Sequence, residues 1–348
     1  MRRIQMNSTI QKSIPVAIVL ICTSLTARAD IRDCLKRSDN WLASTTGRNH
    51  LDNLLTHQTP GGCWPKNIDT TLKPYKGGPD GLKGTFDNGA TVDEIRVLAR
   101  AYNILKKEHY KTACLKGLQC ILKSQYSNGG WPQAPNPNGY QKHITFNDGT
   151  MVGIMNLLRE VHTEPQYDFV SQKIRQQSQH AFDMAVNCIL DCQIRVNGKL
   201  TAWCAQHDRV TLAPRGARSY EHASLSGHES AGIILLLMDI KQPSKRVRES
   251  VKSAVNWFSH SQINGIQIRK NSDGDKQVTH VRGSSPLWAR FYEIETNRPI
   301  FSGRDGVIRY RLEDIEAERR NGYSWYVNSG EKVLHQWKTR GWQDYPDS

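Results

Sequence analysis

Apolar residues recur at three- and four-residue spacing in several long stretches of the chain. In residues 93–108 the repeated apolar positions are Ile95, Leu98, Ala99, Tyr102 and Leu105. Residues 149–163 and 227–241 show the same spacing, which is typical of amphipathic helices. Alternating strand patterns are scarce, and 265–270 is the best short candidate. The pattern therefore predicts a mainly helical protein.

These helical stretches belong to a repeat. Four segments each run from an apolar helix face into a glutamine, then a polar turn with glycine, and usually a tryptophan; the glutamines are Gln58, Gln125, Gln193 and Gln262. Their steps of 67, 68 and 69 residues fit a pair of helices plus a loop. We expect an all-α fold, an (α/α) toroid of repeated helix hairpins, with short irregular or β loops at the active-site end. A helical bundle with chance similarity is the alternative.

The first 29 residues have the pattern of an export signal. They begin with Arg2 and Arg3, continue with an apolar stretch at 14–25 and end in Ala-Arg-Ala at 27–29. A charged start, a short apolar run and small residues at a cleavage site are typical of secretory signals. A buried N-terminal helix is the alternative. We expect cleavage near Ala29, a single catalytic domain at 30–348, and a secreted or periplasmic protein.

The net charge of +14 remains strongly positive after the signal is removed. Four of the 47 basic residues lie in 1–29, so 43 remain against 33 acidic ones, a balance of +10. Such an excess favours an anionic partner. No zinc finger, RNP motif or basic helix points to nucleic acid, and export points to a polymer outside the cell. We expect a monomer that binds an acidic polysaccharide and leaves the membrane after signal cleavage.

Seven cysteines remain once Cys22 is removed with the signal. Oxidising surroundings permit disulfides, but an odd number leaves at least one free thiol. Cys188 and Cys192 are four residues apart on a predicted helix, a spacing that suits packing as well as a bridge. The spacings match no strong zinc pattern, and the sequence leaves the connectivity open.

Two turns carry the same small cluster of oxygen donors. The sequence TFDNGAT at 85–91 contains Asp87 and Asn88, and TFNDGTM at 145–151 contains Asp148. Because both turns stand directly before corresponding helices, the three side chains are expected to converge at one end of the toroid. Carboxylate and amide oxygens suit a hard divalent cation such as calcium. Turn formation and helix capping are the alternative reading.

Several arginines lie among aromatic, glycine or proline residues rather than in solvated charge runs; they are Arg215, Arg218, Arg290 and Arg304. A guanidinium holds a carboxylate in a fixed orientation, although surface arginines packed on the core are an equal alternative. His207 in QHD is more readily a loop histidine whose ring nitrogens are both hydrogen-bonded than a catalytic one.

The residues leave two functions open: a glycosidase using Asp87 and Asp148, and a non-catalytic binder of acidic glycans.

The motifs together resemble those of polysaccharide lyase family 10 pectate lyases. The similarity covers about residues 48–330 and includes TFDNGAT, TFNDGTM, AWCAQHD and ARSYEHASLSGHES. The resemblance implies an α/α toroid that cleaves polygalacturonate by calcium-assisted anti β-elimination. The stretch EHASLSGHES departs from the more apolar, proline-containing sequence expected there, which affects the expected loop shape and subsite preference.

The resemblance also implies roles for individual residues. Asp87, Asn88 and Asp148 match the calcium cluster, and Arg218 matches the arginine placed as the catalytic base. Since a free guanidinium has a pKa above about 12, His222 is a second candidate base.

The substrate contacts implied by the resemblance are also basic. Arg290 and Arg304 match arginines that grip substrate carboxylates. Lys66, beside Trp64, is a weaker candidate for a further substrate contact.

Overall fold

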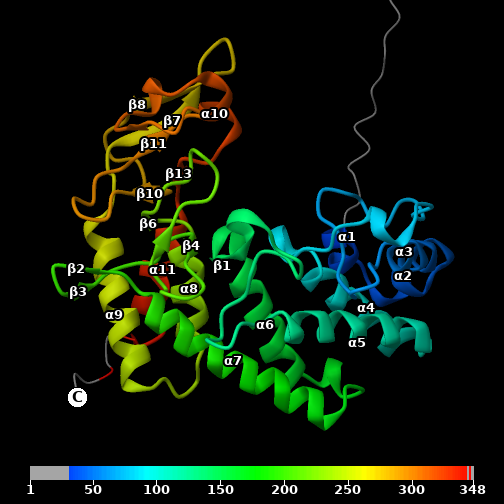
Figure 1. Cartoon of the computed structure of the whole chain (residues 1–348). Coiled ribbons are helices and arrows are strands. Elements are labelled where there is room, and N and C mark those ends of the chain that lie inside the picture. The colour runs from blue at the N-terminus through cyan, green and yellow to red at the C-terminus, as the bar shows by residue number, and fades with distance from the viewer. Residues whose placement is uncertain (1–30, 343–344, 346–348) are drawn as a thin grey trace, which may run out of the picture.

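The computed structural model describes residues 31–342 and 345 (Figure 1). The expected signal at 1–29 and the start of the mature chain lie outside the described residues. The α-helices are α1 (Ile31–Lys36), α2 (Asp39–Ala43), α3 (Thr45–Thr56), α4 (Val92–Leu105), α5 (Glu108–Lys123), α6 (Thr150–Thr163), α7 (Gln172–Cys192), α8 (Glu229–Met238), α9 (Lys245–His260), α10 (Ala317–Gly322) and α11 (Ser329–Thr339).

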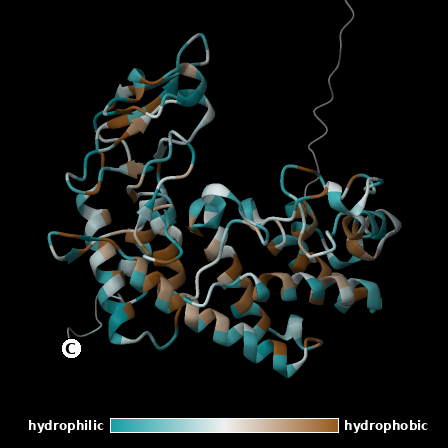
Figure 2. Cartoon of the chain, in the orientation of Figure 1, coloured by the Kyte–Doolittle hydropathy of each residue, from teal (hydrophilic) through white to brown (hydrophobic). Residues whose placement is uncertain are grey.

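The main helices form hairpins in two layers. Helices α4 and α5, α6 and α7, and α8 and α9 pack as consecutive pairs. The first members α4, α6 and α8 also contact one another in order, as do the second members α5, α7 and α9. Figure 2 shows apolar and polar residues alternating along these helices. This arrangement confirms the predicted helical toroid. No helix within the described residues is long and apolar enough to cross a membrane.

The repeat that the glutamines and tryptophans predict is confirmed by hydrogen bonds. Four fully buried indoles each donate to a carbonyl of the preceding helix: Trp64 to Leu54, Trp131 to Ile121, Trp203 to Ile189 and Trp288 to Phe258. Three glutamine amides donate to the second helix of the next unit: Gln58 to Ala113, Gln125 to Ala181 and Gln193 to Ser250. The glutamine therefore joins one unit to the next, because its amide satisfies a carbonyl of the neighbouring helix.

Short strands connect the loops at the end of the toroid that carries the acidic turns. The strands are β1 (Ile144–Thr145), β2 (Arg195–Val196), β3 (Lys199–Leu200), β4 (Gln206–His207), β5 (Pro214–Arg215), β6 (Leu225–Ser226), β7 (Ile266–Lys270), β8 (Lys276–His280), β9 (Trp288–Ala289), β10 (Phe291–Tyr292), β11 (Phe301–Ser302), β12 (Ile308–Arg309) and β13 (Tyr326–Val327). All pairings are antiparallel: β1-β4-β5, β6-β10, β9-β13, β2-β3, β7-β8 and β11-β12.

The strand predicted at 265–270 is β7, which pairs with β8 as a hairpin. This hairpin belongs to a strand-rich part of the chain that follows α9 (Figure 1). Aromatic residues of this part, together with Tyr220 from the loop between β5 and β6, form a second hydrophobic cluster beside the main helical core; the largest members are Tyr220, Phe291, Phe301 and Trp325. The cluster packs beneath the loops that carry Arg218, Arg290 and Arg304.

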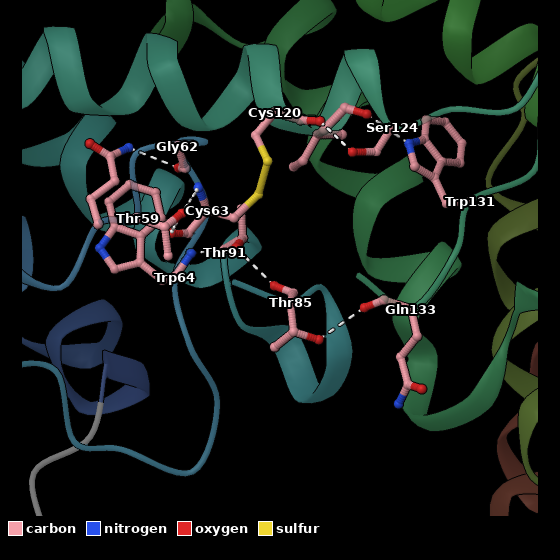
Figure 3. Close-up of a disulfide and its surroundings, with 12 residues drawn as sticks. Thr59, Gly62, Cys63, Trp64, Thr85, Thr91, Cys120, Ser124, Trp131 and Gln133 are labelled. Carbon is pink, nitrogen blue, oxygen red and sulfur yellow. Dashed lines mark hydrogen bonds between the residues drawn. A yellow bond between two sulfur atoms is a disulfide. The ribbon is translucent and has the colours of Figure 1, made fainter. Parts of the chain in front are cut away.

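One disulfide, Cys63–Cys120, ties the loop after α3 to α5 (Figure 3). The other five cysteines of the described residues are buried thiols. Cys188 precedes its repeat glutamine by five residues, as Cys120 does, but the position before the tryptophan is Gly130 in the second unit and Cys63 in the first. Cys188 therefore lacks the partner that its position in the repeat would use.

Candidate active site

The two acidic turns lie together. Turn η2 (Asp87–Gly89) and turn η4 (Asn147–Gly149) pack against each other, and both contact the beginning of α6. In each turn the second residue has a left-handed backbone, with φ of 55° at Asn88 and 50° at Asp148. Asn and Asp tolerate this conformation better than other residues with a side chain. The structure therefore brings the three predicted donors, Asp87, Asn88 and Asp148, to one end of the helices.

Asp87 is buried and bonded at one oxygen only. Its Oδ2 accepts a hydrogen bond of 2.7 Å from Gln133 Nε2 and pairs with Lys66 Nζ. Its Oδ1 is buried and has no hydrogen-bond partner. Gln133 comes from the loop of the second unit, and the repeat places it just after Trp131. The sequence analysis did not identify Gln133 as a site residue, although this repeated motif could have indicated it.

Asp148 is bonded to Arg290, a residue from far along the chain. Arg290 Nη2 donates to Asp148 Oδ1 at 2.8 Å, and Asn147 Nδ2 donates to Asp148 Oδ2 at 2.7 Å. Burial raises the pKa of Asp148, but the bond and charge of Arg290 outweigh it, so the pKa lies below its usual value. Arg290 is only 6% exposed, whereas the Asp148 side chain is 28% exposed, so only the arginine side of this pair is shielded from water.

A second buried carboxylate holds Arg290. Glu229, the first residue of α8, accepts from Arg290 Nη2 at 2.7 Å through Oε1, and its Oε2 accepts from the Ser226 hydroxyl. Burial lowers the pKa of Arg290, yet Glu229 and Asp148 raise it above its ordinary value. The sequence analysis quoted the motif that contains Glu229 without assigning it a role. Its buried position at the start of a helix appears only in the fold.

Arg218 forms a two-point ion pair with Glu221, which lies three residues later in the same loop. Its Nε donates to Glu221 Oε2 at 2.8 Å, and its Nη2 donates to Oε1. This bonding raises the pKa of Arg218, although burial opposes it. The Tyr323 hydroxyl donates to Glu221 Oε1 at 2.7 Å. The fixed carboxylate thus keeps the proton on Arg218 in this arrangement.

Tyr323 connects the two central arginines. The Arg290 guanidinium carbon lies 4.7 Å from the centre of the Tyr323 ring, and that of Arg218 lies 5.9 Å from it. Cations bind favourably over aromatic rings at these distances. The structure therefore brings Arg218, Arg290 and Asp148 into one connected cluster. Sequence reasoning missed Tyr323, which lies in a run rich in aromatic residues.

The remaining predicted substrate residues lie at the edge of this cluster. Arg304 is exposed, and its Nε and Nη2 each donate to Glu318 at 3.0 Å. Its loop approaches the loop of Arg218, since a side chain on Gly306 would lie 3.4 Å from the Ser219 carbonyl oxygen. Lys66 is one-third exposed and is held by Asp87.

The two histidines differ in their bonding. His207 is fully buried; its Nε2 accepts from the Cys204 amide, its Nδ1 donates to the Leu212 carbonyl, and burial lowers its pKa to about 4. The interpretation as a satisfied loop histidine is therefore confirmed. His222 is half-buried, its Nε2 has no hydrogen-bond partner, and burial lowers its pKa. A neutral imidazole of this kind is able to accept a proton.

The described residues contain no group of three or more His, Cys, Asp or Glu side chains spaced to hold a metal ion. The predicted donor set has two carboxylates and one amide, Asp87, Asp148 and Asn88. Calcium usually takes six to eight oxygen ligands. The remaining ligands would therefore have to come from water or from a bound acidic sugar.

Comparison with known proteins agrees with the fold and the motifs. A family model described as pectic acid lyase matches residues 48–334. Two similar solved structures are a family 10 polysaccharide lyase from Cellvibrio cellulosa and a mutant of it in complex with trigalacturonic acid. Each is 35% identical, with a TM-score of 0.79 over 87% of this chain and 96% of the other. No curated protein matches the chain.

Proposed function

Because the chain belongs to the pectic acid lyase family and is a pectate lyase, we propose that it cleaves α-1,4-linked polygalacturonate by calcium-assisted anti β-elimination. The products would be 4,5-unsaturated oligogalacturonates. The observation that carries the mechanism is the packing of the two acidic turns beside Arg290, with Arg218 on the same tyrosine ring. The mutant relative's complex with trigalacturonic acid supports an acidic sugar substrate.

The residues of the two turns fit a calcium ion chemically. Asp87 Oδ1 is a buried oxygen without a partner, and such an atom favours a cation that completes its bonding. Asp87, Asn88 and Asp148 would hold the ion through oxygen atoms, the ligand type that calcium prefers. When bound, calcium would withdraw electron density from the substrate carboxylate and make the C5 proton more acidic.

The arginines would bind and orient the substrate. Arg290 is fixed by Asp148 and Glu229, so its charge is in place before substrate binds, and it stabilises negative charge that develops on the sugar carboxylate. Arg304 is exposed and paired only at the surface with Glu318, so it can turn toward a second carboxylate. Lys66 would contribute a further positive charge beside Asp87.

We assign proton removal from C5 to Arg218. The ion pair with Glu221 raises the pKa of Arg218 and works against a neutral guanidinium. The role therefore requires that substrate binding or alkaline pH weaken this pair. His222, with its unpartnered Nε2 and lowered pKa, is the alternative base. In either case the C4–O bond breaks as the proton leaves, without a covalent intermediate.

Membership in a lyase family argues against the two other functions that the sequence leaves open. A hydrolase using Asp87 and Asp148 would release reducing ends without unsaturation, and a glycan-binding protein would release nothing.

We further propose that the protein is exported, to the periplasm or outside the cell, and acts as a monomer. The support for export is the pattern of residues 1–29, and tagging the intact chain and fractionating cells tests it.

The decisive experiment is incubation with polygalacturonate and calcium. Ultraviolet-absorbing unsaturated ends should accumulate, and a chelator should stop the reaction until calcium is restored. Magnesium added after the chelator controls for a general divalent effect, because magnesium demands a stricter octahedral shell. Product formation that is equally fast with chelator would refute the role of calcium and leave the lyase activity standing.

A further inference from the structure

A pocket of about 330 Å³ opens beside turn η2, between α1, the loop after Trp64 and the start of α4. Its polar lining consists of Arg32, Lys66, Asn67, Asp69, Asn88 and Glu94. Lys66 and Asn88 belong to the proposed active site as well, so the pocket is continuous with it. The lining combines two cationic and two carboxyl side chains, and two of its buried oxygens lack a partner.

Glu94 supplies the first of these oxygens. It is only 2% exposed and lies at the start of α4, where the nearby backbone N–H groups of Thr91 and of Glu94 itself act to lower the pKa of its carboxyl against the effect of burial. Its Oε2 is buried and has no hydrogen-bond partner. Burial raises the pKa of Glu94 to about 8. Glu94 therefore brings a buried oxygen without a hydrogen-bond partner to the wall of the pocket.

Asp69 supplies the second oxygen. Its Oδ1 accepts from the Thr71 amide at 2.9 Å and from the Thr71 hydroxyl at 2.7 Å, which fixes the loop. Its Oδ2 is buried without a partner. Each of the two carboxyl groups in this pocket thus has one buried oxygen without a hydrogen-bond partner.

We propose that this pocket is a subsite for an additional uronate unit of the polysaccharide, in which Glu94 and Asp69 bond sugar hydroxyls and the cationic wall receives the carboxylate. The inference rests on the proposed polygalacturonate substrate. A hydroxyl both donates and accepts, so it bonds Glu94 Oε2 whether that carboxyl is protonated or ionised. A uronate unit carries both the hydroxyls and the carboxylate that this lining would bond, whereas inorganic phosphate offers few hydroxyls to satisfy both oxygens.

The test measures kcat/KM on saturated oligogalacturonates of three to six units for the full-length protein and its Glu94→Ala variant. A subsite outside the cleavage point affects only chains that reach it. We expect about a tenfold loss on the longest oligomers, the value of one or two lost hydrogen bonds, and a loss below about twofold on the shortest. Glu94→Gln should recover most of the difference, because its side-chain amide also bonds hydroxyls and keeps the size of the carboxyl group.

Asp191→Ala, on the outer helix α7, is the control for a lost acidic side chain. If Glu94→Ala fails to fold by thermal unfolding, Asp69→Ala takes its place in the same series. An equal loss at every length, or no loss at any length, would overturn the subsite. If the unmodified protein forms no unsaturated product from any of these chains, the proposed reaction fails instead. Binding of the longest oligomer by calorimetry then still tests the pocket.

Discussion

Turns η2 and η4 follow the same path with acid and amide exchanged. A fully buried phenylalanine precedes each turn, the first residue of each is buried, and the second has a left-handed backbone. In η2 these two positions hold Asp87 and Asn88, and in η4 they hold Asn147 and Asp148. The shared backbone shows that the two units are copies of one structural motif, and the exchange affects only where each charge lies.

Position decides how each carboxylate is neutralised. Asp87, at the buried position, is bonded by Lys66 and Gln133 from neighbouring loops. Asp148, at the half-buried position, is bonded by Arg290 from the strand-rich part of the chain. Each turn thus faces its own cation, and the pair presents one buried and one accessible carboxylate. A functional site can thus arise from two copies of a repeat when the acid and the amide exchange places in one of them.

Replacing both acids, in Asp87→Asn/Asp148→Asn, should have the largest effect. The two turns would keep their shape, because asparagine tolerates both positions, but would lose both negative charges. We expect turnover of polygalacturonate to fall by about a thousandfold or more. The initial rate of ultraviolet-absorbing product measures this at several calcium concentrations. A rate within tenfold of the original protein at every concentration would contradict a shared role for the two turns.

Arg218→Lys should cost nearly as much turnover while substrate affinity is kept. Lysine retains the positive charge but not the planar group that Glu221 and Tyr323 hold in place. We expect kcat to fall by at least about a hundredfold, with little change in the binding of polygalacturonate measured by calorimetry. Arg215→Lys is the matched control, since Arg215 lies just before the same loop, is paired with Asp208 and should lose little turnover when its charge is kept. Comparable kcat in Arg218→Lys would remove Arg218 from the base role and favour His222.

The contribution of Asp148 to stability should depend on pH. The pKa of Asp148 is lowered by Arg290, so its contribution to stability is complete above its ordinary pKa of 3.8 and is lost as the pH falls through the lower value in the folded protein. Asp148→Asn should therefore reduce the free energy of unfolding at pH 6 and much less near pH 2. Urea unfolding at both pH values measures this. Asp273→Asn, at an exposed site, is the control; an equal deficit at both pH values would argue against the Arg290 pair as its source.

Asn88→Gly should have the smallest effect. Glycine adopts the left-handed backbone of Asn88 without strain, so we expect the free energy of unfolding to change by less than about 1 kcal/mol. Loss of the amide oxygen should raise the calcium concentration for half-maximal rate about three- to tenfold. Asn197→Gly is a matched control, since Asn197 is exposed with φ of 51° in the remote turn between β2 and β3. An unchanged calcium requirement would remove Asn88 from the metal site.

Local patterns predicted much of this architecture. The three-residue and four-residue spacing gave α4, α6 and α8, and the glutamine period gave the hairpin repeat, because each unit buries the same face against its neighbour. The strand-rich region after α9 was predicted only at β7. Most of its strands have two residues, which is too few for an alternating pattern to be recognised.

The residues of the candidate site also divide into those that local sequence identifies and those that it does not. Asp87 and Asp148 could be identified because their turns repeat in sequence. Glu229, Gln133 and Tyr323 could not, since nothing local distinguishes a carboxyl, amide or phenol that will be buried from one that will face water. Their importance comes from partners more than forty residues away in sequence.

The sequence by itself determined the repeating helix pairs, the two donor turns and the lyase family, because these depend on short-range spacing and on motifs that keep their order. Only the tertiary structure decided that Gln133 bonds Asp87, that Arg290 pairs with Asp148, and that Arg218 shares the Tyr323 ring with Arg290. Such pairings arise when loops from different units are packed at one end of the helices, and burial there sets the strength of each charge.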